Sequence, residues 1–239
     1  MTSKIAIIGN GAINNKHGKF IDSCDIVIRM KQFVTEGYEE HVGTKLDIYV
    51  SKWFSWFEAV KPYSSRDMSH VMCAKEFWFM FCDPYINHAT DNNYAQEYLK
   101  YSLVSDTPKK DCTLSQHEHL ISKFNLCKDK IKYYPIQYIE ELAGILNISP
   151  TLTTDKYGRS ALIEPRVGIR TIHKVVSEYP NENIYIAGFD CLYDSTGKAN
   201  MTYTGWYWDS AHKPNHDHNF LSEKVYINSL IKTGKVIEL

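Results

Sequence analysis

The sequence has no apolar run that approaches the length of a membrane-spanning helix, so it predicts no transmembrane segment. It also has almost no net charge, −1 at pH 7, and therefore lacks the basic surface with which proteins bind nucleic acid. Its six cysteines form no Cys-x-x-Cys pair, which argues against a zinc site. No secretory signal precedes the first apolar run, so we expect reduced thiols and a cytoplasmic location, with peripheral contact to the inner membrane left open.

Apolar runs alternate with segments of helical spacing along the 239 residues. Short apolar runs predict strands at 5–8, 26–30, 46–50, 76–81, 131–134, 183–189 and 236–239. Helical spacing predicts helices at 92–103, 136–146, 166–179 and 219–231, and the polar stretch 149–160 is expected to be a loop. Strands that alternate with helices indicate a parallel sheet with helices on both faces. We therefore predict one Rossmann-like α/β domain over residues 1–239.

Two of the predicted strands end in glycine, one at Gly9-Asn10-Gly11 and a later one at Gly188. Glycine lets a ligand approach the backbone, and Asn10 offers an amide donor and acceptor at the turn. Parallel strands end at one edge of the sheet, where such folds bind ligands, so both turns should lie there. The long aromatic and histidine-rich stretch 193–217 is expected to cover this edge as a lid. A tight turn without a ligand is the alternative, because the third glycine of the dinucleotide fingerprint is missing.

Four segments resemble, in order and spacing, the sialylmotifs of the animal-type sialyltransferases. The large motif is matched by Gly9-Asn10-Gly11, Arg29-Met30-Lys31-Gln32, Gly37-Tyr38-Glu39 and Val42-Gly43, with Asp22 and Asp25 as its acidic pair. The small motif is matched by Pro165, Gly168 and Gly188-Phe189, the third by Trp206-Tyr207-Trp208-Asp209, and the last by His218 and Glu223. Bacterial lipooligosaccharide sialyltransferases share the Gly-Asn-Gly turn and a Gln-Phe pair like Gln32-Phe33. Residues 51–148 match nothing in these families.

The resemblance implies an inverting glycosyltransferase with a variant glycosyltransferase-A fold. Such an enzyme moves sialic acid, or a related acid sugar, from a CMP-sugar to an oligosaccharide hydroxyl. Galactose of a surface lipooligosaccharide in a bacterium is the expected acceptor. By the same resemblance, the donor should be bound by Gly9, Asn10, Gly11, Arg29, Lys31, Gln32, Arg166, Gly168, Gly188, Phe189, Asp190, Tyr193 and Tyr203.

The resemblance also makes His218 the candidate base, because the acceptor hydroxyl must lose a proton and histidine titrates near neutrality. Tyr207 is the candidate to meet the leaving phosphate, and Glu223 is expected either to orient the imidazole or to cap its helix. A monophosphate can leave without a divalent cation, and no Asp-x-Asp dyad occurs, so no metal or other cofactor is predicted. A metal cluster of His212, His216 and His218 is the alternative.

Three departures from the motifs leave the donor sugar open. Lys31 replaces an asparagine, Arg166 and Val167 replace a Ser-Thr pair, and Trp206 replaces a histidine. We predict that Lys31 and Arg166 contact the donor's phosphate or carboxylate, since arginine can bind a carboxylate through two parallel bonds. Solvated surface is the alternative for both cations. A CMP-Kdo transferase and a CMP-binding protein without catalysis remain alternative functions, and the oligomeric state is not predicted.

Overall fold

A computed structural model of the chain describes residues 2–51, 69–83, 85–86, 88–102, 118, 121–122, 125–149, 152–154, 160–189 and 220–239. At its centre is a seven-stranded sheet in which every neighbouring pair runs parallel. Its strands are β1 (Lys4–Ile8), β2 (Ile26–Met30), β3 (Ile48–Ser51), β4 (Glu76–Phe79), β5 (Ile131–Tyr133), β8 (Asn183–Ala187) and β9 (Ile237–Glu238). All seven were predicted from the sequence, although β4 ends at Phe79 rather than at residue 81.

The strand order is β5-β4-β3-β2-β1-β8-β9, so the chain builds outward from β1 in both directions. Strands β2 to β5 lie on one side of β1, and β8 and β9 lie on the other. The order therefore reverses between β1 and β8. In open α/β sheets such a switch point leaves a crevice at the carboxyl ends of the strands, and ligands bind there.

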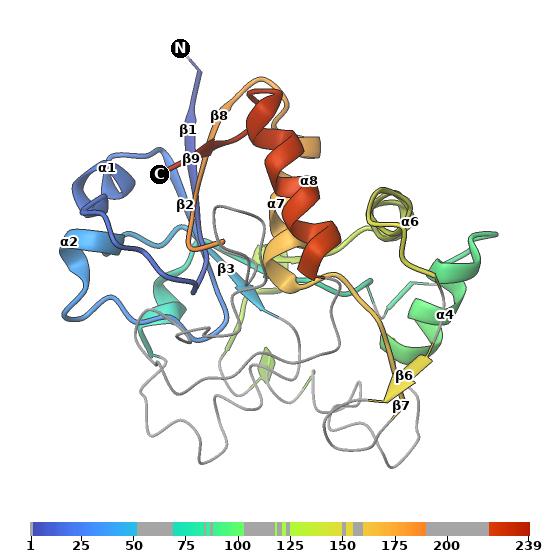
Figure 1. The fold of residues 1–239 in the computed structure, drawn as a ribbon. Helices are drawn as coiled ribbons and strands as arrows, with labels where there is room; N and C mark the ends of the chain where they lie inside the picture. Colours follow the sequence, from blue (N-terminus) through green and yellow to red (C-terminus); the bar gives the residue numbers. More distant parts are fainter. Residues whose placement is uncertain are drawn as a thin grey trace.

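Helices cover both faces of the sheet, as predicted (Figure 1). One face carries the short helices α1 (Gly18–Asp22) and α2 (Glu39–Val42). The other carries α4 (Asn93–Ser102), α6 (Ile136–Ile145), α7 (Val167–Glu178) and α8 (Phe220–Lys232). Two short 3-10 turns, η1 (Ser69–Cys73) and η2 (Lys128–Lys130), precede β4 and β5. No helix in the described part of the chain is long and apolar enough to cross a bilayer.

Alternation along β1 shows how one short run supports both layers. Ile5 and Ile7 belong to the large core that includes Ile172 of α7, whereas Ala6 and Ile8 pack in the core that includes Ile21 of α1. These four side chains are at most 2% exposed. A strand buried on both faces reads as a continuous apolar run, which is why the sequence predicts it so clearly.

The prediction of a loop at 149–160 was wrong. Two short antiparallel strands, β6 (Leu152–Thr154) and β7 (Ser160–Leu162), lie within and at the end of this stretch, with Leu152 opposite Leu162. Three-residue strands are too short to show a period of two, so Pro150 and Gly158 dominated the sequence signal. Tyr94 of α4 donates a hydrogen bond to the carbonyl oxygen of Ile163, directly after β7, at 2.9 Å.

Candidate active site

The turns that follow β1 and β8 lie against each other at the carboxyl edge of the sheet. The Gly9 N–H donates to the carbonyl oxygen of Ala187 at 2.8 Å, and the Gly11 N–H donates to that of Gly188 at 3.0 Å. A Cβ on Gly9 would lie 2.3 Å from the Gly188 oxygen, and Gly188 has φ +75°. Side chains do not fit at either position, so the sequence needs glycine in both turns. The predicted meeting of the two turns at one edge is confirmed.

Asn10 ties the first turn to the end of β2. Its Nδ2 donates to the carbonyl oxygens of Met30 at 3.3 Å and Gln32 at 2.9 Å. Carbonyls can only accept, so these two bonds fix which end of the amide faces them and leave Oδ1 on the other side. Oδ1 is buried, and no described residue donates to it. An unsatisfied buried acceptor is costly, so Asn10 is suited to accept a hydrogen bond from a ligand at this edge.

Lys31, directly after β2, has a left-handed backbone with φ +54°. Its N–H donates to the carbonyl oxygen of Val50 at 2.8 Å, and its own carbonyl accepts from the Tyr49 hydroxyl at 3.0 Å. The backbone is therefore held from both sides in a conformation that asparagine tolerates better than lysine does. This conformation gives a backbone reason for the asparagine that the large sialylmotif carries here, separate from any contact with a nucleotide.

The start of α7 packs onto the same edge. A Cβ on Gly168 would lie 2.7 Å from Cε1 of Phe189 and 3.5 Å from Sδ of Met30, so the helix approaches the ends of β8 and β2 as closely as glycine allows. Arg166 occupies the N-cap position without a side-chain hydrogen bond to the first turn. The first-turn N–H groups of a helix have no intrahelical acceptor and carry positive potential. The start of α7 therefore offers donors for a phosphate beside the two glycine turns.

Arg166 itself is engaged by Glu223 of α8. Its backbone N–H donates to Oε1 of Glu223 at 2.8 Å, and its Nε donates to Oε2 of the same carboxylate. Glu223 is 0% exposed, and the guanidinium lies 4.6 Å above the ring of Phe220. We predicted a donor contact for Arg166 and an imidazole or cap role for Glu223, but not their pairing. The two residues are 57 positions apart, and no local pattern connects them.

Arg29 makes contacts that support the fold, although we predicted it to bind the donor. It is 0% exposed, and its guanidinium donates to the carbonyl oxygens of Lys45 at 2.9 Å and Val42 at 2.6 Å. Asp22 accepts from the N–H of Lys45 at 2.8 Å, and a Cβ on Gly43 would lie 2.3 Å from the same carboxylate. Much of the large motif therefore holds the connection between α2 and β3.

Several predicted residues lie outside the described part of the chain: Asp190, Tyr193, Tyr203, Tyr207, His218 and the stretch 193–217. Their roles stay predictions, as does the alternative metal cluster of His212, His216 and His218. Among the described residues, no three histidine, cysteine or acidic side chains gather as metal ligands would.

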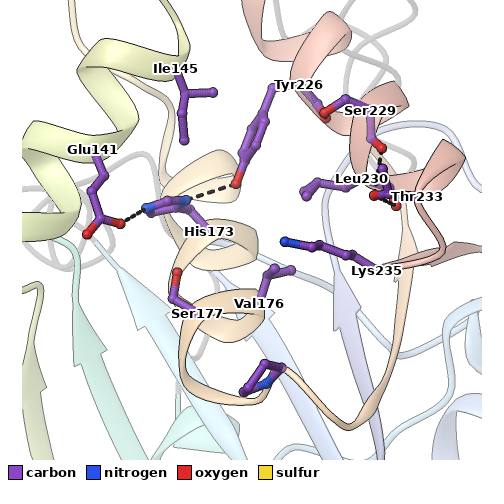
Figure 2. Close-up of a pocket in the computed structure, with 11 residues that line it drawn as sticks. Glu141, Ile145, His173, Val176, Ser177, Tyr226, Ser229, Leu230, Thr233 and Lys235 are labelled. Atoms are coloured by element: carbon purple, nitrogen blue, oxygen red, sulfur yellow. Dashed lines mark hydrogen bonds and ion pairs between the residues drawn. The ribbon is translucent and has the colours of Figure 1, made fainter.

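A pocket of about 610 Å³ lies between α6, α7 and α8, and it contains none of the predicted site residues (Figure 2). Within it, His173 Nδ1 lies 2.9 Å from the Tyr226 hydroxyl, and Nε2 lies 3.3 Å from Oε2 of Glu141. Burial lowers the pKa of His173 although Glu141 opposes this, and burial raises the pKa of Tyr226 to about 12. The three side chains join three helices away from the glycine turns.

The sequence profile of glycosyltransferase family 29 (sialyltransferase) matches residues 2–235. The chain therefore belongs to this family.

Mouse alpha-N-acetylgalactosaminide alpha-2,6-sialyltransferase 1 is 30% identical over 104 residues, which are 43% of this chain and 18% of that protein. The human protein of the same name is 31% identical over 104 residues, 43% of this chain and 16% of that protein. The match thus spans less than a fifth of these relatives. Both are mammalian, and they give no support to a bacterial lipooligosaccharide setting.

The crystal structure of a mammalian sialyltransferase in complex with Gal-beta-1-3GalNAc-ortho-nitrophenol superposes with a TM-score of 0.52 at 19% identity. The superposition covers 100% of this chain and 69% of that one. A second crystal structure of a mammalian sialyltransferase gives a TM-score of 0.53 at 19% identity, over the same shares of both chains. The fold is therefore the variant glycosyltransferase-A fold that the motifs implied.

Proposed function

We propose that the protein is an inverting, metal-independent glycosyltransferase that moves sialic acid from CMP-sialic acid to a hydroxyl of a glycan. The family match supports the reaction class. The observation that carries the proposal is the meeting of both glycine turns with the start of α7 at the switch point between β1 and β8. This is where an open α/β sheet binds a nucleotide.

In this proposal each described feature of the edge has one function in binding the donor. The glycine turns let the nucleotide approach the backbone, and Oδ1 of Asn10 accepts a hydrogen bond from the nucleotide. The first-turn N–H groups of α7 receive the phosphate, and Gly168 keeps that end of the helix close to the sheet. Donors aimed at the phosphate matter most in the transition state, when it gains charge as it leaves.

The reaction breaks the bond between the anomeric carbon and a phosphate oxygen while the acceptor oxygen attacks from the opposite side. His218 accepts the proton of the acceptor hydroxyl, and CMP leaves with the bonding electron pair. Tyr207, with Tyr193 and Tyr203, would donate hydrogen bonds to the leaving phosphate, and Asp190 follows directly after the β8 turn. One departing phosphate needs no divalent cation, so no metal is required.

Two of the three departures from the motifs have an explanation other than a different donor, and the third, Trp206, lies outside the described residues. Lys31 has a backbone role, and the charge of Arg166 is balanced by Glu223 inside the protein. These two residues therefore give no support to a CMP-Kdo transferase, which stays the alternative. Galactose at the end of an oligosaccharide is the proposed acceptor, supported by the galactose-containing disaccharide in the related mammalian complex. We also propose that the protein acts from the cytoplasmic side on the precursor of a surface oligosaccharide.

The proposal is tested by incubating the protein with each CMP-sugar and a galactose-terminated acceptor, with and without EDTA, and following CMP release. We expect turnover of CMP-sialic acid that EDTA does not change. Turnover of CMP-Kdo alone would favour the alternative enzyme, and CMP binding without turnover would indicate a binding protein. Loss of activity in EDTA that manganese restores would refute metal independence.

A further inference from the structure

The outward side of α8 carries a stripe of apolar and basic residues. Its members recur at the spacing of one helix face, i, i+3, i+4, i+7 and i+11: Leu221, Lys224, Val225, Asn228 and Lys232. Leu221 is 53% exposed and Val225 is 61% exposed, although the opposite side of the helix is packed into the core. This set, the α8 stripe, therefore presents two large apolar side chains to solvent on adjacent turns.

Positive charge gathers on the same side of the molecule. Lys224 and Lys232 belong to the stripe, and Lys235 follows directly after the helix. None of these three lysines pairs with a carboxylate in the part of the chain that the structure describes. The one acidic residue of α8, Glu223, is 0% exposed and does not offset them at the surface. The net charge of −1 for the whole chain thus conceals a local basic excess.

The composition of the α8 stripe fits a lipid surface better than a protein partner. A stable protein interface buries about 800 Å² on each partner around an apolar centre, whereas the stripe offers two large apolar side chains with lysines among them. Exposed carboxylates also flank it, Glu141 on α6 and Glu238 on β9. On a membrane, apolar side chains enter the boundary of the acyl chains, while lysines extend their ammonium groups to anionic headgroups.

We propose that the α8 stripe binds the surface of a membrane that contains anionic phospholipids. Leu221 and Val225 insert between the headgroups, and Lys224, Lys232 and Lys235 contact the lipid phosphates. The stripe contains none of the residues that we assign to the donor, so this binding is independent of CMP. The binding does not depend on the proposed function. Its consequence does: a glycosyltransferase held in this way meets acceptor glycans that are carried on lipid.

The test is flotation of the full chain with vesicles of phosphatidylcholine, with or without phosphatidylglycerol. We expect binding only where phosphatidylglycerol is present, and weaker binding as the salt concentration rises. The double variant Leu221→Gln with Val225→Gln keeps good helix formers and should weaken binding by at least tenfold. Lys224→Gln with Lys232→Gln should weaken it by about 25-fold, because each lysine near an anionic surface contributes about fivefold.

The matched controls are Ile86→Gln, at a side chain that is 58% exposed, and Lys130→Gln, at an exposed lysine of η2. Neither should change vesicle binding. Failure of the wild type to float with the anionic vesicles would overturn the proposal, and so would equal binding by all variants. A dimer in analytical ultracentrifugation that the Leu221 and Val225 changes dissociate, without vesicle binding, would instead make the stripe an interface between copies. If no CMP-sugar is turned over, the proposed function fails while the flotation result stands.

Discussion

The substitution Gly9→Ala tests the contact between the two glycine turns. The new methyl carbon would lie 2.3 Å from the carbonyl oxygen of Gly188, whereas ordinary contact begins near 3.4 Å. The clash is with backbone and not with a flexible side chain, so it can be relieved only if the two turns separate by about 1 Å. Two hydrogen bonds hold them together, Gly9 to Ala187 and Gly11 to Gly188.

The expected loss of stability follows from those contacts. Weakening two hydrogen bonds costs roughly 0.5–1.5 kcal/mol each, and overpacking typically costs about 1–3 kcal/mol. Since the two effects overlap, we expect the free energy of unfolding to fall by about 2–4 kcal/mol. For a chain of this size that corresponds to a Tm lower by roughly 5–15 °C. The affinity for CMP should fall as well, because the turn is displaced at the proposed donor edge.

Gly144→Ala is the matched control, with the same chemical change and the opposite expected sign. Gly144 lies in α6, and nothing lies within 4 Å of its added methyl group. Alanine has a higher helix propensity than glycine, so this variant should gain about 0.5–1 kcal/mol. Differential scanning calorimetry of both variants measures the contrast. An unchanged or raised Tm for Gly9→Ala would refute the packing described for the two turns.

Three further changes test separate features. Lys31→Asn should raise the free energy of unfolding by about 0.5–1 kcal/mol, because asparagine accepts the left-handed backbone at lower cost, and a tenfold loss of CMP affinity would instead show that the lysine binds the donor. Asn10→Ala should weaken CMP binding in calorimetric titration by tenfold or more while the protein stays folded, and unchanged affinity would reduce the turn to a structural role. The pKa of His173 is lowered in the folded protein, so as the pH falls below about 6.5 the unfolded chain takes up the proton first. The free energy of unfolding is therefore fully retained above pH about 6.5 and decreases below it. Chemical denaturation from pH 7.5 to 5.5 should therefore show a steeper fall in stability for the wild type than for His173→Gln, and equal slopes would contradict the assignment.

The sheet could be predicted from the sequence because its strands are buried on both faces. Such strands are continuous apolar runs, and glycine or polar residues mark their ends, as at Gly9 and Gly188. The shared edge of the two glycine turns could also be predicted, since parallel strands end at one edge of the sheet. The hairpin of β6 and β7 was missed because three-residue strands have no readable period.

The site was only partly predictable, and the reason lies in long-range contacts. The Gly-Asn-Gly turn could be predicted because glycine and asparagine directly after an apolar strand are typical of a tight turn. The pairing of Arg166 with Glu223 could not, because nothing local indicates which carboxylate an arginine will meet in the folded chain. The left-handed backbone of Lys31 was missed for a related reason: the lysine was interpreted as a charge, whereas its position constrains the backbone.

The most direct test of the central claim is a transfer assay with the wild type and His218→Ala. Each is incubated with CMP-sialic acid and a galactose-terminated acceptor in EDTA, and the sialylated product is quantified by mass spectrometry. We predict product from the wild type and a kcat lower by on the order of 10²–10⁴ in His218→Ala, with an unchanged Kd for CMP. His212→Ala and His216→Ala should retain most of the activity. Absence of sialylated product from the wild type, or near-normal kcat in His218→Ala, would contradict the account.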